Sequence, residues 1–135
     1  MIAAALRRCL LILWVLPGTL VGLTFGLLAL ATGGGCRRRS IILEFWGGAV
    51  TWMLKHCTPL PGGVSGMTLG HVVIGRSPEA LDFCREHELV HVRQYERWGP
   101  FFIPVYLLLS VIIYFRGGHA YFDNPFEREA YEEAP

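Results

Sequence analysis

The sequence contains no closely spaced pair of cysteines. Its four cysteines are separated by more than 20 residues: Cys9, Cys36, Cys57 and Cys84. A zinc ribbon needs C-x-x-C pairs, so this class of structural site is excluded. Cys9 lies in an apolar run, which disfavours a disulfide framework. We therefore expect four free thiols, buried in the protein or in a membrane.

Acidic residues are absent from the first 40 positions. That segment holds five arginines, whereas residues 41–135 hold seven Lys or Arg against eleven Asp or Glu. The more polar part is therefore mildly acidic, although the whole chain has a formal charge of +1. A nucleic-acid-binding domain gathers basic groups on its folded part. We therefore expect no nucleic-acid partner.

No charged residue lies between Cys9 and Cys36, and residues 10–31 are almost wholly apolar. A transmembrane helix needs about 20 such residues, and a membrane helix tolerates a kink at Pro17. We therefore expect residues 9–32 to contact the lipid bilayer as a single-pass anchor. A cleaved secretory signal is the alternative, although its apolar run is usually ~7–15 residues. Similar numbers of arginines flank both ends, so the sequence sets no orientation.

The polar part contains one H-E-x-x-H motif, His87-Glu88-Leu89-Val90-His91, in which two histidines are four residues apart. Residues four apart lie on the same face of a helix. His87 and His91 can therefore both direct an imidazole towards one metal ion. Glu88 follows the first histidine, where its carboxylate can reach a metal-bound water instead of the metal.

The segments around this motif predict a small α+β domain over residues 40–135, after an anchor with basic flanks over residues 1–39. Residues 40–46 and 67–74 have the composition of strands. Residues 49–54 follow a glycine pair and predict a third strand, with a short helix over 49–56 as the alternative. We therefore expect a small sheet of about three strands.

Three helices are expected in the second half of the chain. Ser77 can cap a helix that begins at Pro78, carries the H-E-x-x-H motif and ends at Trp98. The apolar residues 101–115 are too few to span a bilayer. If they crossed it, the tail would lie on the other side from the histidines. We therefore expect a non-spanning helix, in the core or in the interface, followed by a short C-terminal helix from Pro125.

The third metal ligand is expected downstream of the motif. The extended pattern H-E-x-x-H-x-x-G-x-x-H is absent, because Gln94 and Arg97 occupy the glycine and third-histidine positions. A carboxylate later in the chain is therefore needed to complete a zinc site. Glu127 begins the sequence Glu-Arg-Glu-Ala, which places carboxylates on the predicted C-terminal helix.

The combination of H-E-L-V-H with a later E-x-x-A resembles the gluzincin zinc metallopeptidases, particularly small membrane-anchored, minigluzincin-like proteins of bacterial type. The resemblance covers residues 67–135. It implies that His87, His91 and Glu127 bind Zn²⁺ and that Glu88 is the general base for hydrolysis of a peptide or protein substrate. It also implies that residues 67–74 form the sheet edge along which the substrate lies.

The sequence departs from the gluzincin pattern at Tyr131, where the family has an acid that orients a ligand histidine. Asp123 and Glu129 are candidates for that role, because a metal-binding imidazole needs a hydrogen-bond acceptor. Glu129 is also the alternative to Glu127 as third ligand. Candidates for the donor to a tetrahedral oxyanion are His119, Tyr121 and Tyr95. The alternatives in function are a catalytically inactive metal-binding protein and a structural membrane protein without peptidase activity.

Overall fold

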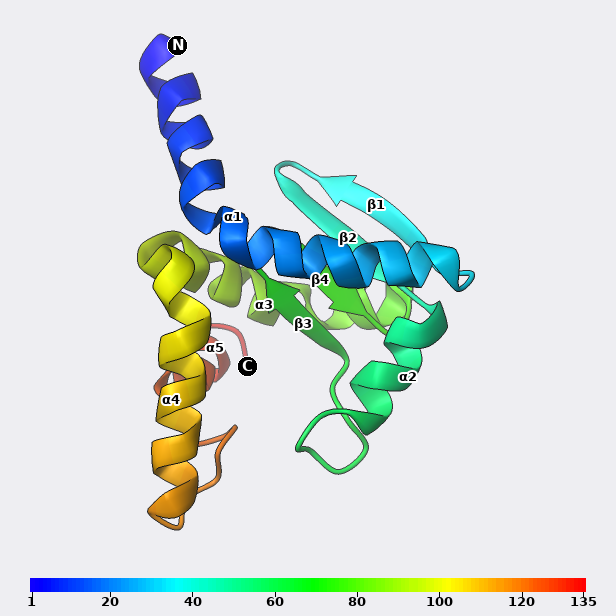
Figure 1. Ribbon diagram of the computed structural model, residues 1–135, viewed down its shortest axis with the longest axis vertical. Helices are drawn as coiled ribbons and strands as arrows, with labels where there is room; N and C mark the ends of the chain where they lie inside the picture. Colours follow the sequence, from blue (N-terminus) through cyan, green and yellow to red (C-terminus); the bar gives the residue numbers. More distant parts are fainter.

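The computed structural model describes all 135 residues and has a mixed α+β fold with a four-stranded sheet (Figure 1). The α-helices are α1 (Ile2–Ala31), α2 (Gly48–His56), α3 (Pro78–Trp98), α4 (Phe102–Phe115) and α5 (Pro125–Glu133). A short 3-10 helix, η1 (Gly99–Phe101), joins α3 to α4. The strands are β1 (Gly35–Arg39), β2 (Ile42–Trp46), β3 (Gly66–Leu69) and β4 (Val72–Gly75).

The sheet has the strand order β1-β2-β4-β3, so β3 is an edge strand. Strands β2 and β4 are parallel, and the other two pairs are antiparallel. Successive side chains of a strand point to opposite faces. Val72 and Ile74 accordingly pack in the cluster that includes Ala29 of α1, whereas Val73 packs with Leu81 of α3. The sheet is therefore covered by α1 on one face and by α3 on the other (Figure 1).

Two of the predicted strands are different in the structure. Residues 49–54 belong to α2, so the strand prediction is wrong and the helical alternative is correct. Residues 67–74 form an antiparallel hairpin instead of one strand. Gly70 allows this turn because its φ of 67° lies in the left-handed region, which glycine adopts at little cost.

The sheet begins before the position at which the sequence predicted the domain to start. Residues 35–39 form β1, which pairs with β2 along its whole length. The predicted division between residues 39 and 40 therefore falls inside a β-hairpin. All four cysteines are free, as expected, and Cys36 and Cys57 are not buried in the protein.

Helix α1 contains Pro17 and bends in its middle, so that its second half lies across the sheet while its first half projects away (Figure 1). The contact is made by a stripe of small residues: Gly18, Gly22, Gly26 and Ala29. A Cβ atom on Gly22 would lie 2.6 Å from Cβ of Val72, so only glycine permits this approach. Within the predicted lipid-facing residues 9–32, this stripe therefore faces protein.

Two helical stretches are long and apolar enough to cross a membrane, namely Ile2–Ala31 and the run Pro78–Phe115 formed by α3, η1 and α4. Phe102 is the buried residue of α4. The loop after α4 returns the chain to α5, which lies beside α4 and α3 (Figure 1). The C-terminal segment is therefore on the same side of α4 as the histidines of α3.

The predicted starts of α3 and α5 are confirmed. The Ser77 hydroxyl accepts a hydrogen bond from the Ala80 N–H at 3.0 Å, and Asn124 Oδ1 accepts one from the Phe126 N–H at 3.0 Å. The Asn124 side chain also donates to the Tyr106 carbonyl at 3.1 Å. This bond fixes the first turn of α5 against α4 and thereby places Glu127.

Candidate metal centre

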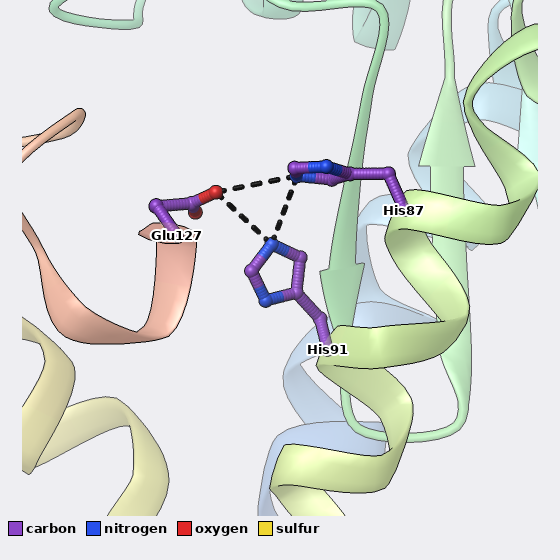
Figure 2. A group of neighbouring side chains, drawn as sticks. All are labelled: His87, His91 and Glu127. Atoms are coloured by element: carbon purple, nitrogen blue, oxygen red, sulfur yellow. Dashed lines mark hydrogen bonds and ion pairs between the residues drawn. The ribbon is translucent and has the colours of Figure 1, made fainter. Parts of the chain in front are cut away.

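Three side chains from two helices meet at one point, as Figure 2 shows. Nε2 of His87 and Nε2 of His91 lie 3.3 Å apart on α3. Oε2 of Glu127 on α5 lies 3.3 Å from the first nitrogen and 3.2 Å from the second. The sequence prediction that these residues lie together is therefore confirmed in geometry, and they form a group that could hold a metal ion.

The triangle of donor atoms has the dimensions of a zinc site. Zinc ligands lie ~2.0–2.1 Å from the ion at tetrahedral angles, which places any two of them ~3.3 Å apart. All three sides of the triangle agree with that distance. Three protein ligands would leave a fourth position open, as in catalytic zinc sites.

Gln94 sets the tautomer of His91. The Gln94 side-chain N–H₂ donates to the Phe126 carbonyl at 2.9 Å, so its Oε1 is the atom that faces Nδ1 of His91, at 2.8 Å. Nδ1 of His91 must therefore donate. In a neutral imidazole, Nε2 is then a bare acceptor that faces the Glu127 carboxylate. A proton on Nε2 or a metal ion at the centre of the triangle would satisfy this arrangement of acceptors.

Tyr106 holds the other oxygen of the third ligand. Its hydroxyl donates to Oε1 of Glu127 at 2.8 Å, which leaves Oε2 directed at both imidazoles. Burial alone would raise the pKa of Glu127, but hydrogen bonds from His87 and His91 outweigh it and lower this pKa to about 2. Glu127 is therefore a carboxylate at any physiological pH.

The same environment favours positive charge on His91. Burial alone would lower the pKa of His91, but the hydrogen bond to Glu127 and the charges of Glu88 and Glu127 raise it to about 9. The negative charges of Glu88 and Glu127 would stabilise a proton on His91, and they would equally stabilise a metal ion at the centre of the triangle.

Glu88 lies next to His87 in the chain and makes no hydrogen bond with the three donor atoms. Its side chain is 6% exposed and lines the same cavity as His91 and Glu127. Oε2 of Glu88 accepts a hydrogen bond from the Thr68 hydroxyl on β3 at 2.6 Å. The carboxylate is therefore fixed in orientation by a strand that the H-E-x-x-H motif does not include.

The three predicted oxyanion donors occupy different surroundings. His119 is exposed, and its Nδ1 accepts from the N–H groups of Tyr121 and Phe122. Tyr95 lines the cavity, but its hydroxyl donates to the Thr68 carbonyl at 3.2 Å. Tyr121 also lines the cavity, and burial raises the pKa of its hydroxyl, which therefore keeps its proton. The Tyr121 hydroxyl lies 3.3 Å from the Tyr131 hydroxyl, and either can donate to the other.

The two acids considered for the place of Tyr131 lie away from the ligand imidazoles. Asp123 accepts a hydrogen bond from the His119 N–H at 2.7 Å, and Glu129 pairs with Arg97. Both predictions of a role beside a ligand histidine are wrong, because these carboxylates face a turn and the solvent. The Tyr131 ring instead packs edge-on against His87, with 4.6 Å between ring centroids.

The site opens into a cavity of about 430 Å³. Edge strand β3 forms one wall, the loop after α2 and part of α1 form others, and α4 closes the far side. Most of the lining side chains are apolar. Glu88, His91 and Glu127 thus line a largely apolar pocket beside edge strand β3, and His87 contacts the last two of them.

Three residues of the site are absent from the sequence predictions: Gln94, Tyr106 and Thr68. Gln94 follows His91 by three residues, so its place on the same helix face could have been recognised. Tyr106 and Thr68 have no sequence signal, because their contacts with Glu127 and Glu88 arise only when α4 and β3 are packed.

Replacing Gln94 with Ala should lower zinc affinity by about 10–100-fold, because hydrogen-bond partners of metal-binding histidines contribute about that much. The Phe126 carbonyl would also lose its donor, which we expect to cost about 1–3 kcal/mol of folding free energy. Competition with a chromophoric chelator measures the affinity, and urea unfolding measures the stability. An unchanged zinc affinity would show that Gln94 does not orient His91.

Comparison of the chain with protein-family models, with curated proteins and with solved structures gave no match.

Proposed function

We propose that the protein is a membrane-associated zinc metallopeptidase of the gluzincin type. The observation that carries the proposal is the triangle of His87, His91 and Glu127, whose sides of 3.2–3.3 Å fit tetrahedral zinc. Glu88 adds a buried carboxylate in the same cavity. A metal site that served structure alone would need neither that carboxylate nor an adjoining pocket.

The residues have separate roles in this proposal. His87, His91 and Glu127 would hold zinc, which when bound supplies a Lewis acid and lowers the pKa of a coordinated water. Glu88 accepts the proton of the attacking water and delivers it to the leaving amine. Thr68 keeps the Glu88 carboxylate oriented through its hydroxyl. The Tyr121 hydroxyl donates to the developing oxyanion.

The substrate in this proposal is an extended peptide. Strand β3 has a partner on one side, β4, and borders the cavity on the other. An edge strand presents unpaired backbone groups that can bind a peptide by strand addition. We place the scissile bond between β3 and the zinc ligands, which puts it within reach of Glu88.

Metal analysis and a peptide-library assay test the proposal together. Detergent-purified protein should contain zinc at near-stoichiometric level and should cleave members of a diverse peptide library. A chelator should abolish the cleavage, and added zinc should restore it. Zinc without cleavage would replace the proposal with an inactive metal-binding protein. Absence of zinc under metal-replete expression would contradict the site itself.

Zinc affinity should increase with pH up to about 9. Zinc needs a bare Nε2 on His91, whose pKa is raised from 6.5 to about 9, so the ion competes with a proton below that pH. Affinity should therefore rise about tenfold per pH unit from neutral pH and then level off. Calorimetry in buffers of different ionisation enthalpy should detect about one proton released per zinc. A plateau already reached at neutral pH would contradict the raised pKa.

A further inference from the structure

We propose that the face formed by the outer sides of α1 and α4 rests on a lipid bilayer, and that the cavity of the metal site opens towards this bilayer. The proposal concerns how the protein sits at a membrane and does not depend on peptidase activity. It replaces the transmembrane span expected over residues 9–32 with a contact along the surface of one leaflet.

The outer side of α1 is apolar and exposed along its second half. The glycine stripe of this half faces the sheet, while the opposite side exposes Leu20, Leu27 and Leu30, with Leu27 65% exposed. A helix packed on a soluble domain normally has a polar outer face. Here the outer face has no charged residue between Cys9 and Cys36.

Helix α4 has the same character. One side contacts α5 and its preceding loop through Tyr106 and Ser110. The other side exposes Leu108, Val111 and Phe115, with Leu108 59% exposed. No charged residue occurs between Gly99 and Arg116. A contiguous exposed apolar surface on a protein marks a protein or membrane contact.

The two apolar surfaces are joined and include the rim of the cavity. The rings of Trp14 on α1 and Phe101 before α4 are in edge contact, with centroids 6.2 Å apart. Val21 of α1 and Leu107 of α4 both line the cavity and are both exposed. In Figure 1, α1 passes in front of the sheet and α4 in front of α5. One bilayer surface can therefore contact both helices and the mouth between them.

The distribution of charge indicates that a lipid bilayer covers the apolar face of α1 and α4. None of the eleven acidic residues lies on α1, α2 or α4; they occur on β2, α3, α5 and the loop before α5. Exposed arginines border the apolar surface, with Arg7 and Arg8 on α1 and Arg116 after α4. Basic groups at such a border are attracted to anionic headgroups.

Neither helix is free to cross the bilayer. The part of α1 before the contact of Trp14 with Phe101 is residues 2–13, about 18 Å long at ~1.5 Å per residue, against a hydrocarbon core of ~30 Å. Helix α4, with 14 residues, is also too short, and Glu127 on the returning segment contacts both histidines of α3. A crossing by α4 would break the metal centre. Contact from one side accommodates both helices.

Spin labels on the full-length protein test this orientation. In a background with the four native cysteines replaced, single cysteines are introduced as Leu27→Cys on α1 and as Leu108→Cys or Val111→Cys on α4. Phe83→Cys is the matched control, because Phe83 is an apolar residue of α3 that is 85% exposed, one turn from Glu79 and Glu86. The labelled proteins are reconstituted in vesicles of phosphatidylcholine and phosphatidylglycerol in equal amounts.

Collision rates of the labels with oxygen and with a water-soluble nickel chelate give the result. Oxygen is concentrated in hydrocarbon and the chelate is excluded from it. We expect labels at 27 and at 108 or 111 to favour oxygen several-fold over the chelate, and the label at 83 to show the reverse. If the labels on both helices collide more often with the chelate than with oxygen, as the control label is expected to do, the proposal is overturned. Shielding from both reagents, with spin–spin broadening, would overturn it in favour of a second copy covering the face.

Discussion

A Glu127→Gln variant should lose at least about a hundredfold in zinc affinity. Zinc binding of about 10–16 kcal/mol is shared among four ligands, so one ligand accounts for about 3 kcal/mol, and each 1.4 kcal/mol is tenfold. The amide keeps the shape of the side chain and can still accept from Tyr106, so the loss reports the missing charge and ligand. Equilibrium competition with a chromophoric zinc chelator measures it.

Glu129→Gln is the matched control on the same helix. Glu129 is paired with the exposed Arg97, whereas Glu127 is the carboxylate that meets the histidines. Loss of an exposed ion pair costs about 1 kcal/mol or less, and zinc affinity should not change. A result in which Glu129→Gln loses zinc and Glu127→Gln keeps it would exchange the two roles and contradict the geometry of α5.

A Glu88→Gln variant should retain zinc and lose peptide hydrolysis by about 10²–10⁴-fold, the usual contribution of a general base. Glu88 makes no hydrogen bond with the three ligand atoms, and the Thr68 hydroxyl can donate to the amide oxygen as it does to the carboxylate. The fold and the metal content should therefore survive. Initial rates with a cleaved peptide at saturating zinc, together with zinc content, measure both properties.

Glu86→Gln provides the control for Glu88. It removes the same charge from an exposed position of α3 two residues away, and its rate should equal that of the wild type. If Glu86→Gln slows hydrolysis as much as Glu88→Gln does, the loss is a general charge effect. If Glu88→Gln hydrolyses peptides at the wild-type rate, another group is the base.

Helix α3 and the start of α5 could be predicted because their signals are local. The Ser77 cap, Pro78 and the four-residue spacing of the histidines act within one helix. The cap at Asn124 is equally local. The apolar character of residues 10–31 and 101–115 is likewise a property of composition. The resemblance to gluzincins added Glu127, which the structure then placed beside both histidines.

The strands were harder to predict because a strand depends on distant partners. Residues 35–39 are arginine-rich. They form β1 only because β2 pairs with them and Glu44 forms ion pairs with Arg37 and Arg39. Residues 49–54 alternate like a strand, yet α2 forms because Val50 and Leu54 pack into the cluster beneath α1. Tertiary packing overrides local β propensity at both places.

The sequence by itself determined which side chains could bind a metal ion, since helical spacing and charge are properties of the residues and their order. Only the tertiary structure decided what surrounds them. Gln94 orients His91, Tyr106 holds Glu127, and Thr68 holds Glu88, through contacts between separate elements. The tertiary structure also decided that the second half of α1 lies on the sheet. Gly22 has no side chain, so the helix backbone can lie directly against Val72.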